Sequence, residues 1–269
     1  MKPQPAARKL TPIAEAVTEL LASLPCMAET EEIPLRLAVG RIVGTDVLAN
    51  VNVPPHANSA MDGYAVRSAE FKKERIFSVS QRIAAGEVGH ELEDGSVARI
   101  FTGAPMPLGA DAVVMQENVE LSSEGAKILQ FAAPGENVRV AGEDIEIGQL
   151  LFEQGSRLRP QDIGMLASVG LTQITVRRRL RVALLITGNE LVLPGRPLKP
   201  GQIYNSNNFT LHALLNNLCA EVVEMGVVGD DYATTKSMLT NAAEAADVIV
   251  STGGVSVGEE DHVKAAVDS

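Results

Sequence analysis

The sequence is poor in the residues that usually mark recognisable sites. Its 269 residues include no tryptophan, only 3% aromatic side chains and two cysteines. Cys26 and Cys219 are far apart and have no CxxC spacing, so we expect neither a zinc ribbon nor a disulfide framework. No apolar run reaches the roughly 18 residues of a membrane span, and the first residues lack the apolar core of a signal peptide. These absences predict a cytoplasmic protein with reduced thiols and no membrane partner.

Positive charge is also scarce, because 23 Lys and Arg face 34 Asp and Glu, a net charge of −11. A nucleic-acid partner is therefore not expected, since phosphate backbones attract clustered basic side chains. The one dense basic run, at 177–179, lies between apolar runs and is interpreted as a solvated strand or linker edge. The sequence contains neither GxxxxGK[ST] nor GxGxxG, which argues against P-loop hydrolysis and dinucleotide binding.

The first two thirds of the chain contain three regions with different residue patterns. Thr11 and Pro12 are typical of a helix start, and apolar residues recur at helical spacing up to Leu24, which predicts a helix with one packed face. From about 29 to 143, short β-branched runs alternate with Gly, Pro and Asn, which indicates a β-rich module. A short helix is then expected within 157–170, between a proline and a glycine.

The last third alternates strands with helices, which predicts a parallel α/β sheet. The expected strands are 181–188, 221–229 and 246–250, and the expected helices are 206–218 and 232–246. In such sheets ligands bind beyond the carboxyl ends of the strands. Glu190, Asp230 or Asp231, and Asp261 all follow predicted strands. Carboxylates gathered without a compensating lysine typically bind Mg²⁺, which completes its shell with water and phosphate oxygens.

The stretch STGGVSVGEEDH at 251–262 adds groups suited to an anionic ligand. Gly253 and Gly254 allow close backbone approach, Ser256 offers a hydroxyl and Lys264 a nearby positive charge. Taken singly, an aspartate that caps a helix and glycines that only form turns are the simpler interpretation. Together at one sheet edge, these features favour a phosphate and metal site.

Three further motifs fall in the β-rich region. HANSAMDGYAV contains Asp62, TGAPMP begins with Thr102, and VRVAGED contains Arg139 and Asp144. Their plain interpretations are a turn carboxylate, a proline-braced loop and a surface ion-pair partner. The alternative is that these side chains face a ligand.

In order, SAMDGYA, TGAP, RVAGED, TGNEL, NSN, GDD and STGGVSVGEED resemble the motifs of the molybdopterin molybdenumtransferase family, the MoeA proteins and the gephyrin E-domain. The resemblance covers nearly the whole chain. It implies an enzyme of molybdenum cofactor biosynthesis whose substrates are molybdate and adenylated molybdopterin. With Mg²⁺, the family hydrolyses the phosphoanhydride, places molybdenum on the dithiolene sulfurs and releases AMP.

The resemblance also implies an α/β and β multidomain fold with a helical segment, an inserted β-rich module and an incomplete parallel α/β molybdopterin-binding domain. The boundaries would be 7–28 with 48–56 and 144–179 for the helical and linker domain, 29–47 with 57–143 for the β-rich module, and 180–269 for the α/β domain. The family's C-terminal β-barrel and its lysine-rich motifs have no counterpart in these residues. We therefore expect a C-terminally truncated chain with low activity alone. A homodimer is implied, with molybdopterin adenylyltransferase as a candidate partner.

When each motif is matched to the family, the resemblance implies a role for each candidate site residue. The catalytic residues would be Asp62, Asp144, Glu190 and Asp261, the substrate-binding residues Thr102, Arg139, Gly253, Gly254, Ser256 and Lys264, and the Mg²⁺ ligands Glu190, Asp230 and Asp261. In the family, the β-module of one subunit and the α/β domain of the other form the site.

One residue departs from the family pattern, and two other functions stay open. Asn189 stands where the family commonly has Asp, which predicts weaker metal affinity. The alternatives are a molybdopterin adenylyltransferase-like enzyme and a non-catalytic pterin-binding scaffold that complements a separate C-terminal part.

Overall fold

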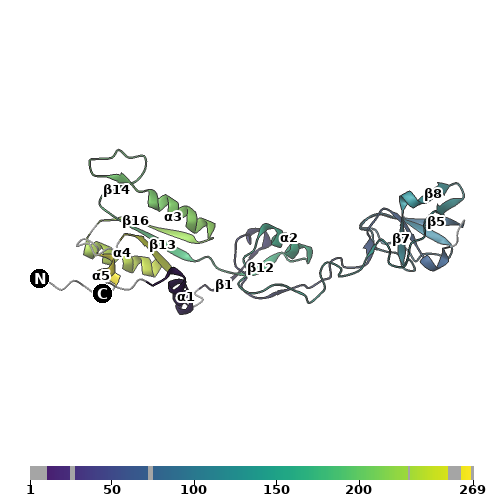
Figure 1. Cartoon of the computed structure of the whole chain (residues 1–269), viewed down its shortest axis with the longest axis horizontal. Coiled ribbons are helices and arrows are strands. Elements are labelled where there is room, and N and C mark those ends of the chain that lie inside the picture. The colour runs from purple at the N-terminus through teal and green to yellow at the C-terminus, as the bar shows by residue number, and fades with distance from the viewer. Residues whose placement is uncertain (1–10, 25–27, 72–74, 230, 254–261, 268–269) are drawn as a thin grey trace. The chain divides into compact units, whose positions relative to one another are not determined.

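The structure, a computed structural model, describes residues 11–24, 28–71, 75–229, 231–253 and 262–267. The chain divides into an α/β unit, Met1–Glu31 with Arg177–Ser269, and a β unit, Glu32–Val176 (Figure 1). The predicted combination of α/β and β-rich parts is thus confirmed. None of the helices in the described ranges is long and apolar enough to cross a membrane.

A six-stranded mixed sheet forms the larger part of the β unit, with strand order β7-β4-β6-β5-β9-β8. Only β5 and β6 among these neighbours run parallel. The strands are β4 (Gly63–Val66), β5 (Ile76–Ile83), β6 (Ser96–Ile100), β7 (Ala112–Met115), β8 (Val119–Ser122) and β9 (Gly125–Ile128), with short 3-10 helices η2 (Ser68–Glu70) and η3 (Gln116–Asn118) between them.

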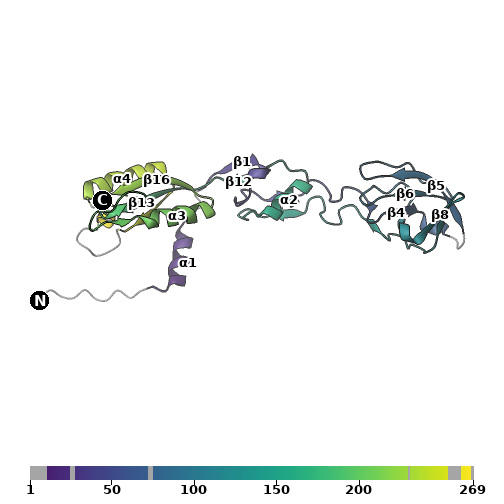
Figure 2. The same ribbon diagram turned by 90° about the horizontal axis from the view of Figure 1, so that it is seen from above.

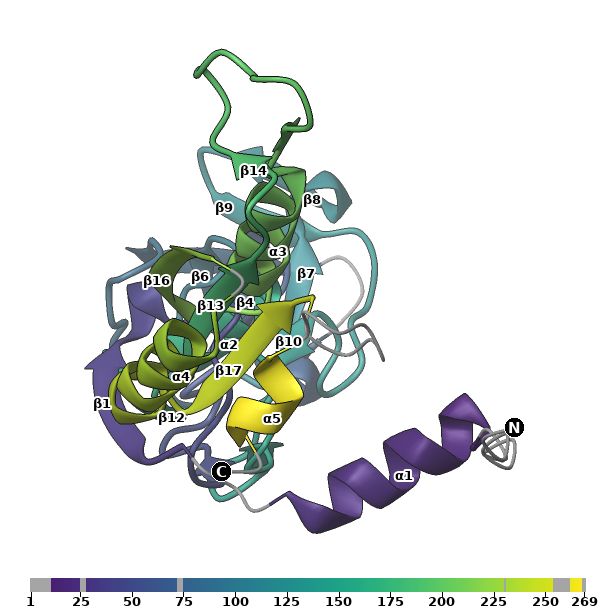
Figure 3. The ribbon, with the colours of Figure 1, turned by 90° about the vertical axis from the view of Figure 1, so that its left-hand side faces the viewer.

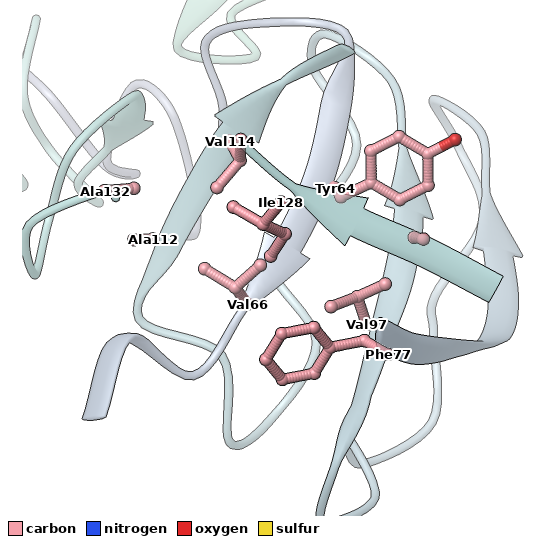
Figure 4. Close-up of a cluster of buried hydrophobic side chains, with 9 residues drawn as sticks. Tyr64, Val66, Phe77, Val97, Ala112, Val114, Ile128 and Ala132 are labelled. Atoms are coloured by element: carbon pink, nitrogen blue, oxygen red, sulfur yellow. The ribbon is translucent and has the colours of Figure 1, made fainter. Parts of the chain in front are cut away.

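Both faces of this sheet are buried around β4, β6 and β7, because side chains alternate between two apolar clusters. Tyr64 and Val66 join one cluster, whereas Ala65 between them joins the other. Figure 4 shows part of the first cluster, which comprises Tyr64, Val66, Phe77, Val97, Ala112, Val114, Ala126, Ile128 and Ala132. The continuous hydrophobic run of β7 follows from this two-sided burial.

Short strand pairs and one helix form the remainder of the β-rich part. The pairs are β1 (Thr30–Pro34) with β12 (Gln173–Arg177), β2 (Val47–Leu48) with β11 (Leu150–Phe152), and β3 (Asn58–Ser59) with β10 (Val138–Arg139). They accompany η1 (Leu35–Leu37) and α2 (Pro160–Ser168). Helix α2 begins at Pro160 as predicted, with Asp162 accepting a 2.7 Å hydrogen bond from the Arg159 N–H. Gly170 follows with φ +83°, the left-handed backbone that glycine adopts at low cost.

The α/β unit contains a parallel sheet of order β16-β13-β17, as the alternation of strands and helices predicts. Helices α3 and α4 cover opposite faces of this sheet (Figures 2 and 3). The elements are β13 (Arg181–Thr187), β14 (Leu191–Val192), β15 (Ile203–Tyr204), α3 (Ser206–Asn217), β16 (Glu221–Val228), α4 (Tyr232–Ala245), β17 (Val248–Thr252) and α5 (Val263–Val267). Central β13 is the most deeply buried strand of this sheet, because the five apolar residues after Arg181 are all buried. Its last residue, Thr187, is partly exposed.

Helix α1 (Ile13–Ser23) forms where the sequence predicts it, directly after Pro12. The packed face that the sequence predicts is not covered by any described residue, since none of the helix residues is buried. Ile13 is 84% exposed and Leu21 66% exposed. The apolar periodicity predicted the helix correctly, but the described residues supply no surface that covers it.

Candidate functional site

Three motifs that are distant in the sequence meet at Ser59 in the β unit. The Ser59 N–H donates to the Ala104 carbonyl at 2.9 Å, and the Gly103 N–H donates to the Ser59 carbonyl at 2.8 Å. Val138 faces Ser59 in the β3–β10 pair. The main chain therefore joins SAMDGYA, TGAP and VRVAGED, and it does so at a residue that is only 1% exposed.

Asp62 and Thr102 are brought into direct contact by this junction. Asp62 Oδ1 accepts hydrogen bonds from both the Thr102 N–H and the Thr102 hydroxyl, each 2.8 Å long. The Thr102 N–H, then its hydroxyl, and the nearby charge of Arg99 hold the pKa of Asp62 below its ordinary value. Asp62 is therefore an ionised carboxylate at neutral pH, and both residues are exposed.

Arg139 and Asp144 lie on the segment that leaves the same junction. Arg139 pairs with Asn58 across the β3–β10 ladder, and its side chain is exposed. The Asp144 N–H donates to the Val53 carbonyl at 2.9 Å. The Asp144 carboxylate takes no part in this hydrogen bond, and the residue is exposed. Neither side chain forms an ion pair with any residue that the structure describes.

In the α/β unit, the carboxyl ends of the three parallel strands share one rim. The Thr187 hydroxyl donates to the Thr252 carbonyl at 3.0 Å, and the Gly188 N–H donates to the Val228 carbonyl at 3.2 Å. Gly253 has φ +94°, and a Cβ placed there would lie 2.6 Å from the Thr187 hydroxyl oxygen. The backbone at Gly253 thus approaches the end of β13 as closely as only glycine permits.

Glu190 and Asn189 belong to the same rim. A Cβ on Gly188 would lie 2.6 Å from Glu190 Oε2, so the carboxylate folds back over that glycine. A Cβ on Gly229 would lie 3.1 Å from Asn189 Oδ1, which places the neutral amide beside the end of β16. The carboxylate and the amide of TGNEL therefore both lie where the strands end, as predicted for a ligand edge.

Asp231 is the N-cap of α4. Of Asp230 and Asp231, it is therefore Asp231 that caps this helix. Its carboxylate accepts a 2.8 Å hydrogen bond from the Thr234 N–H. Hydrogen bonds from Thr234, side chain first, and the nearby His262 hold the pKa of Asp231 below its ordinary value. The other aspartate, Asp230, lies outside the described residues.

Several predicted site residues lie outside the described part of the chain, namely Asp230, Gly254, Ser256 and Asp261. Lys264 is described, on α5, and is exposed. The described residues contain no group of three or more His, Cys, Asp and Glu side chains able to hold a metal ion. Of the predicted Mg²⁺ ligands, Glu190 alone is described, so the magnesium site stays a prediction.

The sequence interpretation missed a pair of arginines beside Asp62 and Thr102. Arg82 on β5 and Arg99 on β6 are register partners, and their guanidinium carbons lie 4.5 and 4.6 Å from the centre of the Phe101 ring. Arg99 donates to the Gly63 carbonyl at 3.0 Å and to Gln116 Oε1 at 2.6 Å. The available signal was the alternation of Arg99 and Phe101 just before TGAP.

Comparison with known proteins agrees with these motifs. Residues 11–170 match the family described as the MoeA N-terminal region (domain I and II), and residues 183–269 match a probable molybdopterin binding domain. The chain belongs to the MoeA family. The resemblance expected from the sequence motifs is thereby confirmed.

Individual MoeA relatives cover nearly the whole of this chain. A molybdopterin molybdenumtransferase from Haemophilus influenzae is 40% identical over 256 residues, covering 94% of this chain and 63% of the relative. Molybdopterin molybdenumtransferase 2 from Mycobacterium tuberculosis is 39% identical, covering 88% and 60%. The chain thus spans about three fifths of the length of these curated relatives.

Solved structures give the same result for the fold. A crystal structure of the molybdopterin biosynthesis MoeA protein from Pyrococcus horikoshii superposes with a TM-score of 0.84 at 33% identity, covering 91% of this chain and 67% of that chain. Another crystal structure of a molybdopterin biosynthesis MoeA protein from this organism gives a TM-score of 0.82 at 36% identity, covering 97% of this chain and 66% of that chain. The mixed fold of this chain is therefore a MoeA fold.

Proposed function

We propose that this chain acts in molybdenum cofactor biosynthesis as a molybdopterin molybdotransferase. The reaction is the Mg²⁺-dependent insertion of molybdate into adenylated molybdopterin with release of AMP. The observation that supports it is the convergence of SAMDGYA, TGAP and VRVAGED on Ser59, in a chain whose family match covers both the MoeA N-terminal region and a probable molybdopterin binding domain.

In the β unit, Asp62 and Thr102 would position substrate. Because the Thr102 hydroxyl donates its hydrogen bond to Asp62, the Thr102 oxygen keeps its lone pairs for a donor on the pterin or ribose. Arg139 would bind a phosphate oxygen, since its guanidinium carries no carboxylate partner among the described residues. Asp144 would contribute a second exposed carboxylate for proton transfer or substrate positioning.

In the α/β unit, the rim of the parallel sheet would hold the phosphoanhydride. Gly253 would present its backbone to substrate at the end of β17, with Gly254, Ser256 and Lys264 following it in the chain. Glu190, Asp230 and Asp261 would bind Mg²⁺. When bound, the ion would supply charge neutralisation and polarisation of phosphorus in an otherwise acidic protein.

The assembly and partners belong to this proposal as well. We propose a homodimer in the cytoplasm, with the division into helical, β-rich and α/β domains expected from the family. Molybdopterin adenylyltransferase is the candidate partner, because its product is the substrate of the proposed reaction.

The decisive experiment supplies what the relatives have beyond the matched region. The 269 residues are fused to the C-terminal part of the Haemophilus influenzae relative, and AMP release from adenylated molybdopterin is followed by chromatography with and without molybdate and Mg²⁺. We expect release that needs both ions from the fusion, little release from the 269 residues alone, and loss on Asp62→Asn or Glu190→Gln. Glu153→Gln, at an exposed acid outside the motifs, serves as the control.

Other outcomes separate the alternatives. A fusion that releases no AMP contradicts the proposed reaction. Formation of adenylated molybdopterin from ATP would instead favour adenylyltransferase chemistry, and pterin binding without either reaction would favour a scaffold. Efficient AMP release by the 269 residues alone would contradict the low activity proposed for them.

A further inference from the structure

The two arginines of the β unit form an arrangement that the proposed function has not used. Arg82 and Arg99 face each other across neighbouring parallel strands, and both guanidinium groups stack on the single ring of Phe101. Arg99 also lies 5.2 Å from the centre of the Tyr64 ring. Ring stacking and the hydrogen bonds to Gly63 and Gln116 fix the direction of Arg99 before any ligand arrives.

This pair carries two like charges, and no described carboxylate lies within salt-bridge distance of either one, although acids outnumber basic residues in the chain. Like charges on directly opposed strand positions repel each other. An anion held between the two guanidinium groups would remove that repulsion, and the forked donors of arginine match tetrahedral oxyanions.

The pair is continuous with the Asp62–Thr102 contact. Thr102 directly follows Phe101 in the chain, and Gln116, which accepts from Arg99, donates its N–H to the Asp62 carbonyl at 3.1 Å. The field of Arg99 reaches Asp62 and favours its ionised form. A ligand that contacts Thr102 therefore lies beside a second, positively charged part of the same surface.

From this geometry we infer that Arg82 and Arg99 form a binding site for a tetrahedral dianion. The inference rests on the proposed function and deepens it. Two sources share this chemistry, namely a phosphate group of the adenylated substrate and molybdate itself. Phe101 acts as a positioning residue, because both guanidinium groups lie over its ring.

The test measures anion binding without turnover. The full chain is labelled with ¹⁵N-arginine, and the Nε–Hε resonances of Arg82 and Arg99 are followed during separate titrations with inorganic phosphate, AMP and sodium molybdate at constant ionic strength. We expect saturable shifts of both resonances, with the apparent affinity weakened about tenfold by Arg82→Gln, the loss expected for one charge-assisted contact. Arg36→Gln, which changes an exposed arginine outside the site, should leave the titration unchanged.

The titrations also identify the source of the anion. Shifts with phosphate and AMP alone assign the site to the substrate's phosphate, and shifts with molybdate alone assign it to the metal oxyanion. Absence of saturation with every anion, or an equal response to chloride, overturns the inference, as does an Arg82→Gln chain that binds like the parent.

Two further controls keep the test independent. Arg99→Gln also removes two hydrogen bonds of the fold, so its binding is interpreted only beside Arg82→Gln. The Arg82 side chain forms no hydrogen bond or ion pair with a described residue. Anion binding together with a fusion that releases no AMP would contradict the proposed reaction and support the anion site. AMP release without anion binding at the two arginines would support the proposed reaction and contradict the anion site.

Discussion

Asp247 is held by both terminal nitrogens of Arg178, with Oδ2–Nη1 and Oδ1–Nη2 distances of 2.6 and 2.8 Å. Its Oδ2 also accepts a 2.8 Å hydrogen bond from the Arg181 N–H. These contacts join the residue before β17 to the first residue of β13. They fix the amino ends of two strands whose opposite ends form the candidate ligand rim.

Replacing Asp247 with Asn should destabilise the α/β unit by about 2 kcal/mol at pH 7, because a carboxylate with 10% exposure loses its charge-assisted partners. Arg178, and then the Arg181 N–H, hold the pKa of Asp247 far below its ordinary 3.8. The stabilisation is therefore complete well above pH 3.8. It begins to be lost as pH falls below 3.8, where the carboxyl of the unfolded chain takes up a proton, and it is gone once pH has fallen through the lowered pKa of the folded state. Urea unfolding of parent and variant at pH 7 and pH 3 measures this, and the difference between them should narrow at pH 3. Glu153→Gln is the control, and an equal difference at both pH values would contradict the assignment.

Removing the Asp62 carboxylate should loosen the TGAP segment without unfolding the β unit. In Asp62→Ala, the Thr102 N–H loses its acceptor, so its hydrogen exchange should become several-fold faster. The Gly103 N–H, which donates to Ser59, should exchange as in the parent and serves as an internal control. Site-resolved exchange by NMR decides the matter, and an unchanged Thr102 rate would show that the contact does not hold the segment.

Alanine at Gly253 should distort the ligand rim beyond the cost of its backbone alone. Gly195 has a similar φ, +90°, with nothing within 4 Å of an added Cβ, so Gly195→Ala measures backbone strain by itself, about 1 kcal/mol. Gly253→Ala adds the contact at 2.6 Å with Thr187 and should cost at least about 1 kcal/mol more. Chemical denaturation of both variants gives the comparison. Equal losses of unfolding free energy in the two variants would mean that Thr187 moves away from the added methyl group at little cost.

Polar substitution on α1 should leave the stability of the single chain nearly unchanged. Leu21 is 66% exposed, so Leu21→Gln should alter the free energy of unfolding by less than about 0.5 kcal/mol. Leu166→Ala, at a fully buried position of the β unit, should cost about 2–5 kcal/mol. Urea titrations at dilute protein concentration compare the two. A large loss from Leu21→Gln would mean that a surface covers this helix in solution.

The elements that follow from local patterns were predictable. The strand–helix alternation after residue 180 indicated the parallel sheet, and Pro160 and Gly170 bracketed α2, because these signals lie within one turn or one strand of the element they define. The position of Gly253 at the carboxyl end of β17 followed from the same alternation, whereas ligand binding at this edge stays a prediction. The packing of α1 did not follow, since periodicity reports a helix face and not what covers it.

The long-range contacts of the β unit could not be deduced in the same way. Opposition of Arg82 and Arg99 depends on the β5–β6 register, which shifts between Val79 and Gln81. A shift of one residue moves a side chain to the other face, so no local pattern would have placed the two arginines together. The meeting of Ser59 with Ala104 likewise depends on backbone pairing across more than forty residues.

Ser59 joins its three motifs through main-chain groups, so the junction does not depend on which side chains point outward from it. The positions around it can be varied combinatorially while the scaffold is kept, with Arg82, Thr102 and Arg139 as the first to randomise. A library of this kind would probe the proposed oxyanion site by selection for tungstate over molybdate, without redesigning the fold that presents it.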